Sequence, residues 1–111
     1  MEIIINKHLC EITPLTPIIN KIETERIVEA ILTYKGYKIC INLENVLDCT
    51  INFIDMINNF NNLYFYNINS DIFAIFNKMG LDNKANLYSS EIDLKSNKNR
   101  LINRNFTLLK L

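Results

Sequence analysis

The side chains that most often carry out catalytic chemistry are few and scattered in this sequence. His8 is the only histidine, and neither Lys7 nor Leu9 beside it completes a triad, a zinc site or an acid–base pair. No HExxH, GxxxxGK or GxGxxG motif occurs, and the two glycines are too few for a phosphate-cradling loop. We therefore predict that the protein is not an enzyme, with no catalytic residue, cofactor or metal.

Two carboxylates, Glu44 and Asp48, flank one loop after an apolar run. Open α/β sheets bind ligands where strands end, so this loop is one candidate for a small enzyme or ligand-binding site. A solvated loop in which Asp48 caps the next helix explains the same residues, and we favour it because such caps are common.

Thr50 follows in the segment Asp48-Cys49-Thr50-Ile51, which is predicted to join a strand to a helix. A hydroxyl there lies at the positive end of the helix, next to unpaired backbone N–H groups. Phosphorylation would add about two negative charges at an exposed loop. The simpler alternative is that Thr50 caps the helix through its side-chain oxygen.

Apolar spacing predicts the elements that position these residues. Strands are expected over 3–5, 9–12 and 37–43, the last with apolar odd-numbered positions. A helix is expected to start at Thr16-Pro17 and to end near Gly36, and a second helix over 51–60. The first apolar face is Ile19, Ile22, Ile27, Ala30, Ile31 and Tyr34, and the second is Ile51, Ile54, Ile57 and Phe60 with Phe53 and Met56 beside them.

The strand–helix pattern repeats further along the chain. Leu63–Tyr66 is predicted to be a strand, and Ser70 to cap a helix that buries Ile72, Ile75, Phe76 and Met79 and stops at Gly80. Leu87-Tyr88 indicates a short strand, Ser89 or Ser90 a cap for a helix over 91–102, and 106–111 a further strand. Alternating elements predict an α/β fold, a mixed, mostly parallel sheet of about four to five strands with helices packed against it.

Length and composition narrow the class of protein further. The 111 residues fit one domain, 1–111, with 95–111 as a C-terminal extension. Twelve basic residues balance twelve acidic ones, which disfavours a nucleic-acid binder. In the extension Lys95, Lys98, Arg100, Arg104 and Lys110 are interpreted as a solvated face rather than an anion-binding one.

The expected location is the cytoplasm of a low-GC bacterium. Three widely spaced cysteines do not suggest a disulfide framework, and Cys40 is expected to be a small buried hydrophobic residue. The sequence has no signal peptide and no apolar run long enough to span a membrane. The abundance of isoleucine, asparagine and lysine, which AT-rich codons encode, indicates the low-GC genome.

The segment Ile39-Cys40-Ile41-Asn42-Leu43-Glu44-Asn45-Val46-Leu47-Asp48-Cys49-Thr50 resembles the signature of the STAS domain, the module of sulfate transporters and anti-sigma factor antagonists. That signature has a hydrophobic strand, Asp-Leu, a turn with Val, and Asp-Ser-Ser-Gly opening a helix. Downstream, Leu63–Tyr66 resembles the next strand and the end of the 72–81 segment resembles the family helix that closes in Gly-Leu. In order and spacing the resemblance covers about residues 17–94.

The resemblance implies a STAS-like domain whose function is regulated protein–protein binding. Asp48 matches the family aspartate and Thr50 the serine that partner kinases phosphorylate, while Cys49 stands for the other serine and Ile51 for the glycine. The implied docking surface is the loop and helix at 48–60, and the implied partner is an anti-sigma factor or a serine/threonine kinase. The partner-binding candidates are Asp48, Cys49, Thr50, Asn52 and Phe53.

Two readings of other classes stay open on the sequence alone. One is a small bacterial interaction or immunity-type protein without a phospho-switch, which the chain's size, neutral charge and lack of a catalytic set suit equally. The other is the small enzyme or ligand-binding protein that uses the loop from Glu44 to Asp48.

Overall fold

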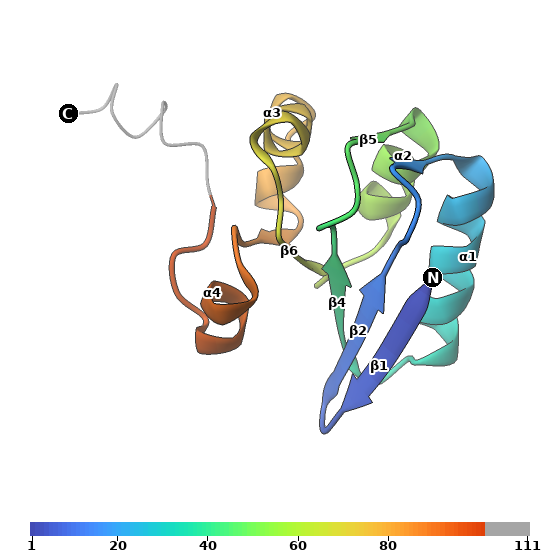
Figure 1. Cartoon of the computed structure of the whole chain (residues 1–111), viewed down its shortest axis with the longest axis vertical. Coiled ribbons are helices and arrows are strands. Elements are labelled where there is room, and N and C mark those ends of the chain that lie inside the picture. The colour runs from blue at the N-terminus through green and yellow to red at the C-terminus, as the bar shows by residue number, and fades with distance from the viewer. Residues whose placement is uncertain (102–111) are drawn as a thin grey trace.

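Five strands form one mixed sheet in residues 1–101, the part of the chain that this computed structural model describes (Figure 1). They are β1 (Glu2–Asn6), β2 (Leu9–Thr13), β4 (Lys38–Asn42), β6 (Tyr64–Tyr66) and β7 (Asn86–Leu87). The sheet order is β1-β2-β4-β6-β7, with β1 antiparallel to β2 and every other pair parallel. The predicted α/β class and mixed, mostly parallel sheet are confirmed, while the strand predicted at 106–111 lies outside the described residues.

Helices pack on this sheet and connect its parallel strands. They are α1 (Lys21–Thr33), α2 (Ile51–Asn59), α3 (Ser70–Lys78) and α4 (Glu91–Ser96), with a 3-10 turn, η1 (Leu81–Asn83), after α3. In Figure 1, α1 and α2 lie on one side of the sheet and α4 on the other. Within the described residues, no helix is long and apolar enough to cross a membrane.

The start of α1 differs from the prediction of a cap at Thr16-Pro17. Asn20 is the cap, because its side-chain oxygen accepts the N–H of Glu23 at 2.9 Å. The preceding Ile18–Ile19 is a short strand, β3, rather than helix. Ile22, expected in the core, is 62% exposed, because Glu23 and Thr24 occupy the positions three and four residues before the buried Ile27.

The later helices show two smaller corrections. Asn69, not Ser70, caps α3 by accepting the N–H of Ile72 at 2.8 Å. Ser90 caps α4 as one prediction had it, but α4 ends at Ser96 instead of 102, because Asn97 turns the backbone into the left-handed region at φ 55°.

The two faces of the sheet bury different side chains because residues alternate along each strand. The face toward α1, α2 and α3 carries the larger core, which includes Cys10, Ile12, Ile39, Ile41, Phe65 and Leu87. On the other face, Cys40 and Tyr66 pack with Tyr88 and with Leu94 of α4. Both faces of β4 are therefore covered, which buries residues 39–43 without a break and confirms Cys40 as a buried hydrophobic residue.

Two short strands lie outside the main sheet and shape one end of the molecule. β3 pairs in parallel with β5 (Asp48–Cys49), with Ile18 opposite Asp48 and Ile19 opposite Cys49. Since β3 immediately precedes α1 and β5 immediately precedes α2, this pairing holds the starts of the two helices together. The segment that the sequence singled out, Asp48-Cys49-Thr50, lies at this junction.

Candidate functional site

Thr50 is held at the start of α2 by the strand beside it. Its backbone N–H and its hydroxyl both donate to the carbonyl oxygen of Ile19, at 3.0 and 3.2 Å. The hydroxyl oxygen also lies 3.4 Å from Oδ1 of Asn52. Although Thr50 stands at the cap position, its side chain makes no capping hydrogen bond, so the alternative that it caps the helix through its oxygen is wrong. The hydroxyl instead donates to the carbonyl of Ile19 beside β5, a contact that spacing along the chain does not reveal.

Of the two residues before Thr50, Asp48 does not cap the helix and Cys49 is not an activated nucleophile. Asp48 is exposed, and its Oδ1 accepts the N–H of Cys49 at 2.8 Å, so it does not cap α2. Burial, and then the nearby Asp48 carboxylate, raise the pKa of the half-buried Cys49 thiol to about 11. The thiol is therefore protonated near neutral pH, and a thiol rather than a thiolate is a poor nucleophile.

Phe53 does not belong to an accessible surface, which corrects its place among the partner-binding candidates. Its side chain is fully buried, and its ring lies 6.0 Å from that of Phe65 and 6.3 Å from that of Phe76. Helical periodicity puts Phe53 on the same buried face of α2 as Ile54 and Ile57. Asn52, one residue earlier, is exposed.

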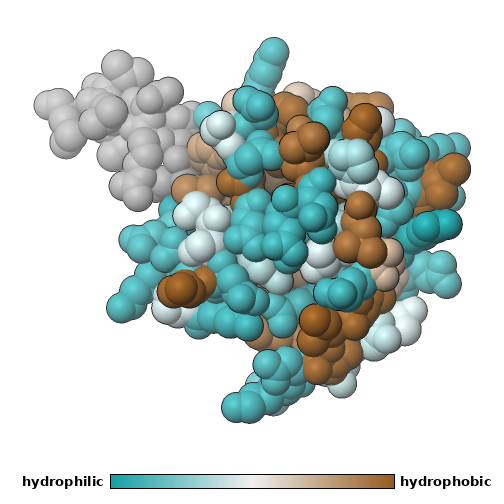
Figure 2. Space-filling model, in the orientation of Figure 1, coloured by the Kyte–Doolittle hydropathy of each residue, from teal (hydrophilic) through white to brown (hydrophobic). Residues whose placement is uncertain are grey.

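Exposed apolar side chains lie on the segments next to Thr50, and the sequence did not single them out as a surface. Ile18, Leu47 and Ile51 are 50%, 68% and 58% exposed. Their backbone segments are held side by side by β3–β5 pairing and by the carbonyl of Pro17, which accepts the N–H of Leu47 at 2.7 Å. We call Ile18, Leu47 and Ile51 the junction patch. Figure 2 shows hydrophobic residues among hydrophilic ones at the end of the molecule where β5, α2 and α3 lie.

Local periodicity misassigned two members of the junction patch. Ile51 was expected on the buried face of its helix, yet it is the first residue of α2 and projects beyond the core. Ile18 follows Pro17 and was expected inside a helix, yet it is paired on β3. The signal in the sequence for this patch is the run of large apolar residues close to Pro17 and Thr50. Buried segments show the same pattern, so it does not identify a surface.

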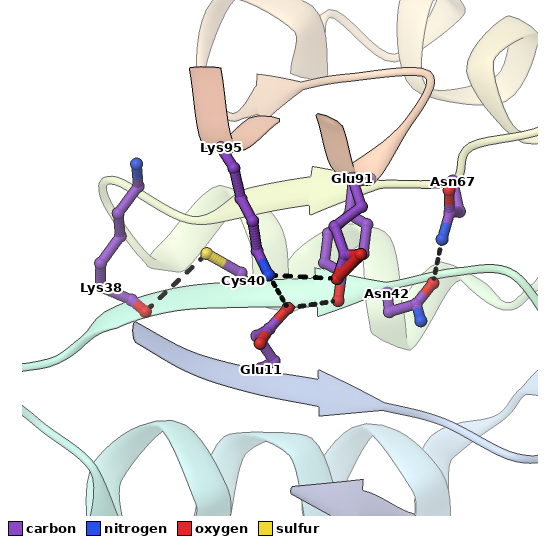
Figure 3. A network of polar contacts seen from close by, with 8 residues as sticks. Glu11, Lys38, Cys40, Asn42, Asn67, Glu91 and Lys95 are labelled. Carbon is purple, nitrogen blue, oxygen red and sulfur yellow. Dashed lines mark hydrogen bonds and ion pairs between the residues drawn. The ribbon is translucent and has the colours of Figure 1, made fainter. Parts of the chain in front are cut away.

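A cluster of polar side chains lies between the sheet and α4 (Figure 3). Glu11 of β2 is 7% exposed, and its Oε1 accepts the hydroxyl of Tyr66 at 2.9 Å. Lys95 of α4 reaches down with its Nζ 3.7 Å from the same oxygen and 3.3 Å from Glu91. Burial first, and then the hydrogen bond to Glu11, raise the pKa of Tyr66, so its hydroxyl stays protonated.

This Glu11–Tyr66–Lys95 cluster attaches α4 to the sheet. The buried carboxylate has a hydrogen-bond donor and a cation, which offsets the cost of removing it from water. The nearby Cys40 thiol is neutral, because burial raises its pKa to about 11. Lys95, which was interpreted as part of a solvated basic face, is engaged by two carboxylates, while Arg104 and Lys110 lie outside the described residues.

The remaining chemistry-bearing residues are not brought together. Glu44 and Asp48 are both exposed. Neither lines the cavity before β4, the pocket at His8 or the groove between β1 and α1. His8 is exposed at a shallow pocket with Lys7 and Lys38. Within residues 1–101, no group of three His, Cys, Asp or Glu side chains could hold a metal ion.

An apolar cavity of about 610 Å³ lies at the end of the sheet where β4 and β6 begin. It is lined by the end of α1 and the loop before β6, including Leu32, Tyr37 and Phe60. Lys35 and Lys38 are its only charged lining residues, so no acid–base pair lines it.

Comparison of the chain with models of known protein families and with curated proteins finds no match.

Proposed function

We infer that this protein is a cytoplasmic regulatory interaction module that resembles anti-sigma factor antagonists, with Thr50 as a phosphorylation site. The observation that carries this proposal is the junction patch, three exposed apolar side chains on the paired segments that lead to the half-buried Thr50. Exposed apolar patches are a common mark of protein–protein contact sites. The partner we propose is an anti-sigma factor with serine/threonine kinase activity.

The order of elements supports the STAS-like character of the proposal. A hydrophobic strand, β4, is followed by the turn at Val46, by Asp48 and Thr50, and by the opening of α2. The next strand, β6, leads into α3, which closes at Gly80-Leu81, with Gly80 left-handed at φ 73°. These are the features, in the same order, on which the resemblance rests.

Phosphate on Thr50 would act on this surface through charge and through local structure. Transfer to Oγ1 removes the hydroxyl proton, so the hydrogen bond to Ile19 is lost. The added charge of about minus two would stand at the start of α2, beside the junction patch, where a docked partner would have to desolvate it. We therefore expect the unphosphorylated form to bind and the phosphorylated form to dissociate.

Binding is tested by capturing partners from the native cell with immobilised protein. Wild type and Leu47→Glu are compared, with Ile92→Glu as the control, because Ile92 is 78% exposed but lies on α4, across the sheet. We expect a protein with a kinase-type ATP-binding domain to be recovered with wild type and Ile92→Glu, and to be lost with Leu47→Glu. Equal recovery with all three proteins would exclude the junction patch.

Phosphorylation is tested with that recovered kinase and ATP, followed by mass spectrometry of the intact protein and its peptides. Wild type should gain one phosphate on Thr50, and Thr50→Ala should gain none. A partner that binds through the junction patch but never phosphorylates Thr50 would instead support the small interaction or immunity-type protein without a switch.

A further inference from the structure

β1 is an edge strand with one side unpaired within residues 1–101. It pairs with β2 over its whole length and has no other neighbour in the sheet order. The opposite edge is different, because β7 has only two residues and the N–H of Leu101 donates to the carbonyl of Leu87 at 2.7 Å. The free backbone of the sheet is therefore concentrated on β1.

The middle of β1 does not carry the usual protection of an edge strand, although Glu2 places a charge at its start. Natural edges are commonly blocked by lysine, proline or a bulge, because their free N–H and C=O groups recruit other strands. Ile3, Ile4 and Ile5 contain no such residue, and their register with β2 runs without a bulge. Ile4 and Ile5 are 49% and 40% exposed, so apolar side chains as well as backbone groups are left open.

We propose that β1 is the contact between two copies of this chain, which pair antiparallel into one continuous sheet across a two-fold axis. This inference is independent of the junction patch, which lies around β3 and β5. A two-fold axis at Ile4 places Ile4 opposite itself, Ile3 opposite Ile5, and Glu2 opposite Asn6. All three isoleucines thus meet isoleucines, and no two like charges are opposed.

Two further features are compatible with a second copy on this edge. The chain has twelve basic and twelve acidic residues, so its formal net charge of zero gives no overall repulsion between copies. A groove between β1 and α1, lined by Met1, Ile3, Ala30 and Tyr34 among others, is open beside the edge. The second copy's Ile5, opposite Ile3, lies on the same face as this groove and would cover it.

The test is the mass of the protein in solution, measured by sedimentation equilibrium from about 1 to 100 µM, the range of ordinary reversible dimers. We expect wild type to reach the mass of two chains and Ile4→Lys to raise the dissociation constant at least about tenfold, because two lysines would then oppose each other. Ile92→Lys, an equal change on exposed α4, should dimerise like wild type. A wild type that stays monomeric throughout, or an Ile4→Lys variant that dimerises equally well, overturns the proposal.

A second variant keeps the test decisive if Ile4→Lys does not fold. In Ile4→Cys, the two new thiols would lie opposite each other on neighbouring antiparallel strands, within the Cα distance that a disulfide allows. Mild oxidation should produce a covalent dimer whose linked peptides both contain position 4. Oxidation of folded protein without a link between the two copies of position 4 contradicts the paired register.

Discussion

Thr50 and Phe53 lie three residues apart in the segment proposed to dock a partner, and only Thr50 can take part directly. The hydroxyl of Thr50 donates to Ile19 at the molecular surface, whereas Phe53 is fully buried between two other phenylalanine rings. Substitution of Phe53 would therefore disturb the core before it reported on binding. Docking is better tested at Leu47, whose side chain is 68% exposed.

The buried hydrogen bond from Tyr66 to Glu11 predicts how much stability is lost when the Tyr66 hydroxyl alone is removed. Tyr66→Phe leaves the buried carboxylate without its hydroxyl donor and should lower the free energy of unfolding by about 1–2 kcal/mol. Tyr64→Phe is the matched control, because Tyr64 contacts Lys38 through its ring, which phenylalanine keeps, and it should change stability by less than about 0.5 kcal/mol. Urea unfolding followed by circular dichroism measures both, and equal effects would contradict this role of Tyr66.

At the scale of elements, asparagine side chains determine where two helices begin. Asn20 and Asn69 each accept an N–H three residues ahead, and Asn69 also donates to the carbonyl of Val46 at 3.0 Å. Asn69 therefore fixes the start of α3 and also ties it to the loop before β5. Genome composition had explained the abundance of asparagine, and the predicted caps were the hydroxyl residues Thr16 and Ser70.

Replacing each of the two candidate caps of α3 by alanine in turn tests which residue is the cap. Asn69→Ala should lower the unfolding free energy by about 1 kcal/mol or more, since it removes a cap and a bond to the loop. Ser70→Ala should be nearly neutral, because Ser70 is exposed and is already the first helical residue. Thermal or urea unfolding of the pair measures the difference, and a larger loss for Ser70→Ala would restore the sequence-based cap.

At the scale of the whole molecule, folding protonates groups that the unfolded chain would ionise in alkali. The thiols of Cys40 and Cys49 have pKa values of about 11 in the folded protein, against an ordinary 9.0, and the pKa of Tyr66 is also raised. A raised pKa means that the unfolded chain loses these protons first as pH increases. The stability is thus complete below pH 9 and is lost progressively as pH rises toward 11.

The unfolding free energy should fall in that interval by up to about 1.4 kcal/mol per pH unit for each thiol. Cys49→Ala should show a shallower fall than wild type, because one of the titrating groups is then missing. Urea unfolding at several pH values from 8 to 11 checks both statements. A wild-type stability that stays constant across this range, or identical slopes for the two proteins, would show that these thiols do not titrate as described.

The sequence by itself determined the elements whose signal is local. Alternating apolar residues marked β4, the three-residue spacing of Ile54, Ile57 and Phe60 marked α2, and Gly80 marked the end of α3, since side-chain direction repeats within a strand or helix. The same signals were sufficient for the α/β class and for the position of Thr50 at a helix start.

Only the tertiary structure decided which of these residues meet. The hydroxyl of Thr50 bonds to a carbonyl 31 positions away, and Tyr66 bonds to Glu11 across 55 positions. Neither contact can be predicted from residue spacing. The first depends on the pairing of β3 with β5, and the second on the positions of β2 and β6 on either side of β4. For the same reason the sequence could mark Phe53 and Ile51 as apolar, but only the packing showed that Phe53 is in the core and Ile51 on the surface.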